Sequence, residues 1–213
     1  MATTTATRPT EQQIVLHDVS WETYERLLID HTDRSVPHFT YDRGKLEILA
    51  PSPEHEIIDR TLALLVELVA AEVLVDVINV GSMTFKRRDL ERGFEPDSSF
   101  YIQNEERVRG LTQIDPAINP PPDLIIEIEI TRSAIPKLPI YASMGVPEVW
   151  RWDGERVTIL QLGDNGYVEV EVSAALPPLT SEILTRFLVA SQTLRRTVWI
   201  RQVRDWARAL GSS

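Results

Sequence analysis

Hydrophobic residues recur at helical spacing in several parts of the chain. The clearest pattern predicts a long helix over residues 54–74, with a broad apolar stripe formed by Ile57, Ile58, Leu62, Leu65, Val66, Val69 and Val73. Shorter helices are predicted over residues 20–29, where Ser20 is a suitable N-cap, and over residues 137–145, which end in Gly145. The same spacing predicts a helical C-terminal part over residues 181–210.

Alternating and short apolar runs between turn signals predict strands in the intervening segments. These strands cover residues 38–53 (two strands), 75–86, 94–102, 123–130 and 148–162 (a hairpin), with a charged loop over residues 86–93. Strands and helices intermingle without strict alternation. The pattern therefore predicts an α/β (α+β) fold in which a central mixed β-sheet is flanked by helices on both faces.

The composition predicts one main domain with short extensions. The chain has 213 residues, of which 43% are hydrophobic, and no Pro-, Gly- or Ser-rich linker divides it. We predict a disordered N-terminal tail over residues 1–12, the main domain over residues 13–190 and a C-terminal helical extension over residues 191–213.

Several classes of protein are disfavoured by composition. The chain has no cysteine, which excludes disulfides and zinc knuckles and fits a cytoplasmic location. No apolar run approaches the about 20 residues that span a bilayer, so we expect no membrane association. The net charge of −10 disfavours a protein that coats nucleic acid. A site where metal ions supply positive charge stays open.

Three acids interrupt an apolar run in the segment PPDLIIEIEIT, residues 121–131. Successive strand side chains point to opposite faces, so Asp123, Glu127 and Glu129 share one face. Their carboxylates can converge, and burial makes the repulsion between them costly. A divalent cation such as Mg²⁺ or Mn²⁺ relieves that repulsion, and Asp97 on another strand supplies a further acid. Without metal, the same repulsion predicts that Glu127→Gln raises stability.

The pattern alone leaves simpler interpretations open. A strand with one solvated face alternates apolar and acidic residues in the same way. Asp123, which follows three prolines, is suited to end the loop with a turn hydrogen bond. The four histidines have no metal-binding spacing and are interpreted as surface or hydrogen-bonded residues; they are His17, His31, His38 and His55.

Four segments together resemble a known family. YDRGKLEILAPSPEHE, FEPDSSFYI, PPDLIIEIEIT and KLPIYASMGVPEVWRWDG, within residues 20–188, resemble the Uma-two family ("putative restriction endonuclease") of the PD-(D/E)XK nuclease superfamily. The resemblance implies a restriction-endonuclease-like core in which Asp97 and Glu127 hold Mg²⁺ or Mn²⁺ and a lysine assists the attacking water. The superfamily lysine stands two residues after the glutamate, where this chain has Glu129. Lys137, at the start of the next helix, matches the position that Uma-two members commonly use instead.

Further candidate residues come from the resemblance and from the charge pattern. Glu56 matches a place from which some superfamily members supply a further acid, although exposure on the helix surface is the alternative. Glu129 is an additional candidate site residue, because it shares the strand face of Glu127. The basic residues Lys86, Arg87 and Arg88 precede Asp97 and are candidate DNA contacts.

These residues predict a Mg²⁺-dependent DNA endonuclease, with Asp97 and Glu127 as metal ligands and Lys137 as the catalytic cation. The superfamily resemblance implies products with a 5′-phosphate and a 3′-hydroxyl. We expect a homodimer, because cutting two strands usually takes two sites.

Two alternatives stay open. One is a catalytically inactive nuclease-fold binding or structural module, favoured by Glu129 and by the net charge of −10. The other is a metal-dependent hydrolase of another phosphate substrate.

Overall fold

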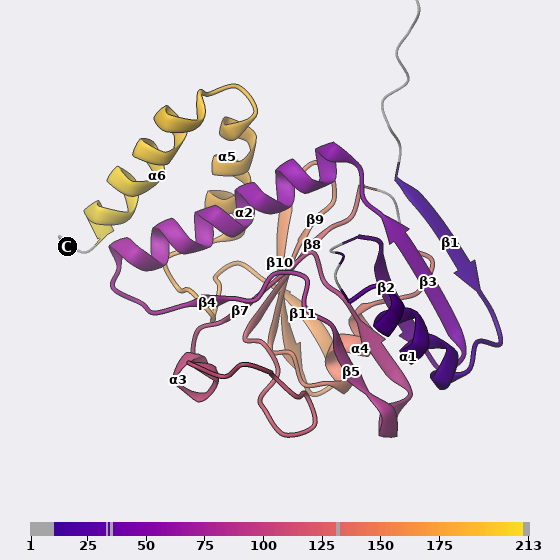
Figure 1. The fold of residues 1–213 in the computed structure, drawn as a ribbon. Helices are drawn as coiled ribbons and strands as arrows, with labels where there is room; N and C mark the ends of the chain where they lie inside the picture. The colour runs from indigo at the N-terminus through magenta and orange to yellow at the C-terminus, as the bar shows by residue number, and fades with distance from the viewer. Residues whose placement is uncertain (1–10, 33, 35, 131–132, 211–213) are drawn as a thin grey trace, which may run out of the picture.

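The computed structural model describes residues 11–32, 34, 36–130 and 133–210. Within these residues the chain forms two sheets and six α-helices (Figure 1). The first sheet is antiparallel and has the strand order β1 (Gln12–Leu16), β3 (Lys45–Ala50), β2 (His38–Asp42), β6 (Arg92–Phe94) and β5 (Phe85–Arg87).

The second sheet is mixed. Its strand order is β11 (Gly166–Val170), β10 (Val157–Gly163), β9 (Glu148–Trp152), β8 (Leu124–Ile128), β7 (Ser98–Tyr101) and β4 (Ile78–Asn79). Strands β8 and β9 are parallel, and the other neighbours are antiparallel. The parallel pair at the centre requires a crossover connection, and that connection contains α4 (Leu138–Ser143).

Helices cover both faces of the mixed sheet. On one face lie α2 (Pro53–Glu72), α5 (Ser181–Ser191) and α6 (Arg196–Leu210), and α4 lies on the other face (Figure 1). The larger core joins α2 to the sheet through fully buried residues that include Leu62, Val66, Leu124, Ile126 and Trp150. Helix α1 (Trp21–Asp30) covers the first sheet, and the short α3 (Glu105–Val108) follows β7. The expected fold class, a mixed sheet flanked by helices, is confirmed.

Local signals explain where the main helices begin. Ser52 is the N-cap of α2, and its hydroxyl accepts a hydrogen bond from the backbone N–H of His55 at 3.2 Å. Pro53 then occupies the first turn, where its missing N–H costs nothing. Ser20 caps α1 in the same way through the N–H of Thr23. The N-cap predicted at Ser20 is confirmed, and α2 begins one residue before the predicted start.

Some segments differ from the prediction. The charged loop expected over residues 86–93 contains a 3₁₀ turn (Arg88–Leu90) and strand β6, which pairs with β5 in a hairpin. Its side chains are charged because one side of this hairpin is exposed. These charges interrupt the apolar alternation from which a strand is predicted. The helical part expected over residues 181–210 is two helices, α5 and α6. In α2, Ile57 is 66% exposed and does not join the buried stripe.

The two ends of the predicted main domain lie close to β1 and to α6. Residues 1–10 and 211–213 lie outside the described part, and β1 begins at Gln12, the last residue of the predicted tail. The predicted extension contains α6, whose Trp199, Val203 and Ala207 are buried in the same core as α2 and α5. Among the helices of the described residues, none is both long enough and apolar enough to cross a membrane.

Candidate active site

Strand β8 presents its side chains to two different buried environments. Leu124, Ile126 and Ile128 pack into the core beneath α2, whereas Ile125 contacts the smaller core around α4. Glu127 points to the α4 side and is only 7% exposed. The alternation predicted from the sequence is therefore present. The alternative of a solvated face does not describe Glu127, because both faces of β8 are covered.

Asp97 lies opposite Glu127 on the neighbouring strand. Ser98 of β7 pairs with Ile126 of β8 in an antiparallel register. Asp97, which precedes Ser98, therefore lies opposite Glu127, which follows Ile126. The Asp97 carboxylate is held in place by the backbone N–H of Ile128, which donates to Oδ2 at 2.7 Å. Asp97 is 6% exposed. Two acids from adjacent strands are thus brought into one buried region, as the sequence predicted.

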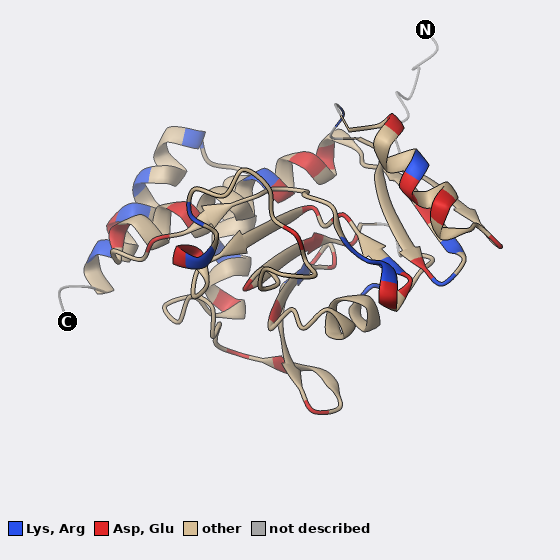
Figure 2. Cartoon of the chain, turned by 60° about the horizontal axis from the view of Figure 1, so that its bottom comes forward, with Lys and Arg blue, Asp and Glu red and all other residues tan. Residues whose placement is uncertain are grey.

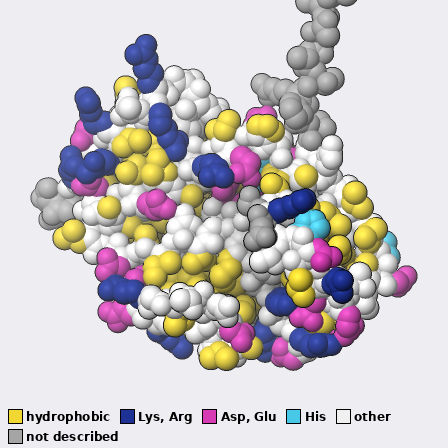
Figure 3. Space-filling view, in the orientation of Figure 1, with side chains coloured by type: hydrophobic (Ala, Val, Ile, Leu, Met, Phe, Trp, Pro, Cys, Tyr) yellow, Lys and Arg dark blue, Asp and Glu magenta, His cyan; other side chains and the backbone are white. Residues whose placement is uncertain are grey.

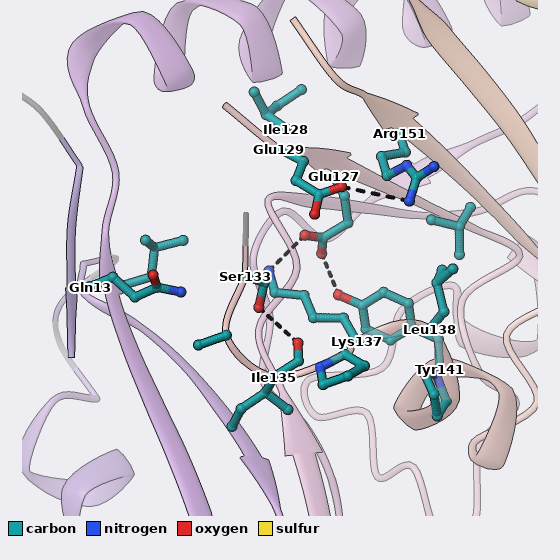
Figure 4. Close-up of a pocket in the computed structure, with 15 residues that line it drawn as sticks. Gln13, Glu127, Ile128, Glu129, Ser133, Ile135, Lys137, Leu138, Tyr141 and Arg151 are labelled. Atoms are coloured by element: carbon teal, nitrogen blue, oxygen red, sulfur yellow. Dashed lines mark hydrogen bonds and ion pairs between the residues drawn. The ribbon is translucent and has the colours of Figure 1, made fainter. Parts of the chain in front are cut away.

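Lys137 also reaches this region. It precedes the first turn of α4, and its Nζ donates to Glu127 Oε2 at 2.7 Å (Figure 4). Tyr141, one turn further along α4, donates its hydroxyl hydrogen to Glu127 Oε1. Both side chains are directed by the packing of α4, since Ile140 and Tyr141 are fully buried against the sheet. The lysine expected beside the acids is therefore supplied from a helix instead of a strand.

The charges of this cluster fix its protonation. Burial lowers the pKa of Lys137, but the carboxylates of Glu127 and Asp97 outweigh burial and raise it above its ordinary value. Lys137 therefore stays an ammonium and is unsuited to remove a proton. Burial would raise the pKa of Asp97, but His38, His55 and Lys137 hold it below its ordinary range. Asp97 therefore stays a carboxylate.

Two histidines lie against Asp97. His55 from the first turn of α2 places Nε2 at 2.8 Å from Asp97 Oδ1, and His38 from β2 places Nδ1 at 3.5 Å from the same oxygen. His55 Nδ1 lies 2.5 Å from Glu11 Oε1. Burial lowers the pKa of His55, but Asp97 and Glu11 outweigh it and raise that pKa to about 10. His55 is thus an imidazolium at neutral pH.

Sequence reasoning missed the place of these histidines. It interpreted all four as surface or hydrogen-bonded residues, whereas His38 is 6% and His55 is 1% exposed, beside a candidate ligand. A signal for His55 was available: it precedes Ile58 and Leu62 by three and seven residues, so it lies on the buried stripe of α2. His38 had no such signal, because its position depends on the approach of the two sheets.

A pocket of about 490 Å³ opens beside Glu127. Its walls come from β1 and β3 of the first sheet, from β8 and β9 of the second, and from residues 133–139, which lead into α4 (Figure 4). Glu47 of β3 fixes one wall: its carboxylate accepts hydrogen bonds from the Ser133 hydroxyl and from the N–H groups of Ala134 and Ile135. Glu47 is 1% exposed and is another site residue that the sequence did not reveal.

The other candidate acids have different surroundings. Glu129 lines the pocket and lies 3.6 Å from the guanidinium of Arg151. Glu56 lies on the outer side of α2 and pairs with Arg60 at 3.2 Å. Asp123 accepts hydrogen bonds from the N–H groups of Ile102 and Asn104 and therefore holds a turn, which is the structural role expected for it.

The candidate DNA contacts are each paired with an acid. Lys86 donates to Glu25 at 2.7 Å, Arg87 contacts Asp89, and Arg88 contacts Glu22. Lys and Arg of this hairpin therefore lie next to acids of the hairpin itself and of α1 (Figure 2). Lys and Arg side chains also gather over α6 (Figure 3), where Arg204 and Arg208 pair with Glu72. DNA contact at Lys86, Arg87 and Arg88 stays a prediction.

Asp97 and Glu127 are the two acids that could hold a metal ion shared with a substrate. Mg²⁺ often takes one or two protein carboxylates and completes its shell with water and substrate phosphate oxygens. In the structure Asp97 Oδ1 lies 2.8 Å from His55 Nε2 and 3.5 Å from His38 Nδ1, and Oδ2 accepts a hydrogen bond from the N–H of Ile128. No group of three or more His, Cys, Asp or Glu among the described residues could hold a metal. Since Lys137 and Tyr141 donate to the two oxygens of Glu127, an ion held by Asp97 and Glu127 would replace some of these contacts, and the two acids do not make a closed structural site.

The architecture and the site define an α+β domain in which two adjacent strands and one helix bring together two acids and a lysine. A family model described as "Putative restriction endonuclease" (Uma2) matches residues 21–193. The chain belongs to this family, which confirms the resemblance found in the sequence. A search of the curated proteins finds no match.

The solved structures that are similar to the chain include the crystal structure of a "putative nuclease belonging to DUF820" from Anabaena variabilis. The identity is 17%, the TM-score is 0.48, and the similarity covers 71% of this chain and 92% of that protein.

Proposed function

We propose that the protein hydrolyses phosphodiester bonds in DNA with the help of Mg²⁺ or Mn²⁺. The observation that carries this proposal is the Lys137 ammonium at 2.7 Å from Glu127, on the strand beside Asp97. The chain lacks the lysine at position 129, yet a cation reaches the acids from α4. Membership of the family described as restriction endonucleases supports the same activity.

Each residue has a role that follows from its charge. Asp97 and Glu127 would hold the ion, and a divalent cation in such a site lowers the pKa of water and neutralises a phosphate. Lys137 stabilises negative charge that develops on the phosphate, because its ammonium stays protonated and points into the pocket. Tyr141 orients the Glu127 carboxylate by its hydrogen bond. His55 and His38 keep Asp97 ionised.

Plasmid nicking tests the proposal. Supercoiled DNA is incubated with the protein and Mg²⁺, Mn²⁺ or EDTA, and the conversion to open-circular DNA is followed. We expect nicking with either metal and none with EDTA. Asp97→Ala and Lys137→Met should each lower the rate by about 100-fold or more. Asp76→Ala, at an exposed acid far from the pocket lining, is the control and should act like wild type. Equal nicking by all variants would mean a contaminating nuclease and would remove the proposal.

A second candidate is a nuclease-fold module that binds without turnover. Glu129 in the expected lysine position and the pairing of Lys86, Arg87 and Arg88 with acids favour it. Under that candidate, wild type would bind DNA and nick no faster than Asp97→Ala.

For an active enzyme we propose a homodimer, since cleavage of both strands takes two sites. Light scattering after size-exclusion chromatography would measure the mass.

A further inference from the structure

Arg151 is placed in the pocket by the register of the mixed sheet. It pairs with Glu127 in the parallel ladder of β8 and β9, so the two residues are direct neighbours across the strands. Trp150 and Trp152, on either side of Arg151, are buried in the core beneath α2. Because strand side chains alternate, Arg151 points to the opposite face, where it lines the pocket with Glu127 and Lys137 (Figure 4).

The pairing of Arg151 with Glu129 is loose. The nearest contact is 3.6 Å, and no hydrogen bond joins the two side chains among the described residues. By contrast, Arg156 contacts Glu169 at 2.9 Å and Arg109 contacts Glu105 at 2.6 Å, each through hydrogen bonds. The Nε of Arg151 is buried and, in the same described part, has no hydrogen-bond partner. A guanidinium has five donors, and since Nε is buried, those that remain for a ligand are the four N–H groups of the two Nη atoms.

The charge and size of the pocket indicate which ligand this arginine suits. The charged residues in the lining are two acids, Glu127 and Glu129, and two bases, Lys137 and Arg151. Since Lys137 is occupied by Glu127, Arg151 is the base whose acid partner is held only weakly. A planar guanidinium matches phosphate oxygens with paired hydrogen bonds. A volume of about 490 Å³ has room for part of one nucleic-acid strand.

We propose that Arg151 binds a backbone phosphate of the substrate in this pocket and that Glu129 competes with that phosphate for the guanidinium. The proposal rests on the function proposed above and names a substrate contact of that site. Glu129 stands where the superfamily lysine was expected, so this chain places an acid–arginine pair beside the acids. Binding of the phosphate breaks the loose ion pair, and the affinity for substrate therefore depends on both residues.

Binding of a fluorescein-labelled DNA duplex, measured by anisotropy in EDTA over a range of NaCl concentrations, tests this proposal without cleavage. Arg151→Gln should weaken binding about tenfold and reduce the slope of log K against log[NaCl] by about 0.9, the loss of one phosphate contact. Arg151→Lys keeps the charge but loses the paired hydrogen bonds, and it should give an intermediate affinity. Arg156→Gln, which breaks an Arg–Glu pair outside the pocket, is the matched control.

The role of Glu129 is tested by a double variant. Glu129→Gln should tighten binding several-fold in the wild-type protein and have no effect in the Arg151→Gln protein, because its influence acts through the arginine. Equal tightening in both proteins would mean general relief of charge and would overturn the competition. Equal affinity and slope for Arg151→Gln and Arg156→Gln would overturn the phosphate contact. Thermal melting of each variant confirms that it is folded.

The nicking assay separates this proposal from the proposed function. If wild type nicks DNA and Arg151→Gln has an unchanged KM, the phosphate contact is wrong and the endonuclease stands. If wild type does not nick DNA, but Arg151→Gln binds DNA more weakly and with a smaller salt slope than wild type, the endonuclease activity is wrong and the phosphate contact stands.

Discussion

Replacement of Glu127 by glutamine tests how the buried charges are balanced. From the sequence, with only acids in view, this change is expected to raise stability without metal by relieving repulsion. The structure adds Lys137 at 2.7 Å from the same carboxylate, and the two side chains are only 12% and 10% exposed. Glutamine would leave the ammonium buried without its hydrogen-bonded acid, with Asp97 and Glu47 as the acids that still act on it, so the structure predicts a loss of stability instead.

The magnitude follows from the cost of an unpaired buried charge. Removing one partner of a buried ion pair costs about 3–5 kcal/mol. The glutamine side chain has nearly the same shape, its oxygen can still accept a hydrogen bond, and its neutrality relieves repulsion with Asp97. These gains place the expected loss at the lower end, about 3 kcal/mol. For a protein of this size, that loss lowers the melting temperature by about 6–12 °C.

The assay is thermal unfolding at neutral pH in EDTA. Glu129→Gln is the matched control, because it removes an acid from the same strand region whose partner lies at 3.6 Å and is partly exposed. Its melting temperature should change by no more than about 2 °C. Lys137→Met should also destabilise the protein, and the double variant should lose less than the sum of the single ones. A melting temperature for Glu127→Gln that equals or exceeds the wild-type value would refute this account of the buried pair.

Three further changes probe other parts of the fold. Burial raises the pKa of Asp59 to about 7, so the stability that its protonated form contributes is present at low pH and lost as pH rises through 7. The stability gained by Asp59→Asn in EDTA should therefore grow between about pH 4 and 8. A gain that is independent of pH would contradict this. Glu148 accepts four hydrogen bonds from Trp150, Ser173 and two backbone N–H groups, so Glu148→Gln should cost about 3 kcal/mol in denaturant unfolding, with Glu169→Gln as an exposed control. Glu47→Ala should lower the nicking rate about tenfold while the protein stays folded, because residues 133–135, which precede Lys137, lose their hydrogen bonds to Glu47. An unchanged rate would show that the position of this loop does not depend on Glu47.

Much of the fold could be predicted because its signals are local. The apolar stripe of α2 and the serine N-cap of α1 are visible in short windows of sequence, and the structure confirms them. The division into two sheets was not visible, since strand pairing depends on contacts far apart in the chain. The hairpin of β5 and β6 was missed because its charged side chains follow its exposed side and mask the strand pattern.

The candidate site divides in the same way. Asp97 and Glu127 could be predicted from a strand pattern and a family resemblance, and the register of β7 and β8 places them opposite one another. Lys137 required the resemblance, because no local rule says that a helix start returns to a strand ten residues earlier. His38 and Glu47 come from the first sheet, so their roles became visible only when that sheet was seen against the second.

The relocation of the lysine changes what the site depends on. A lysine at position 129 would have been placed by the end of strand β8, which it directly follows. Lys137 instead is held by two separate contacts: α4 packs its Ile140 and Tyr141 against the mixed sheet, and Glu47 of the first sheet binds the backbone of residues 134 and 135. The position of the ammonium therefore requires that both sheets are correctly placed. Since the same two sheets also form the pocket walls, the shape of the pocket and the position of the cation depend on the same packing.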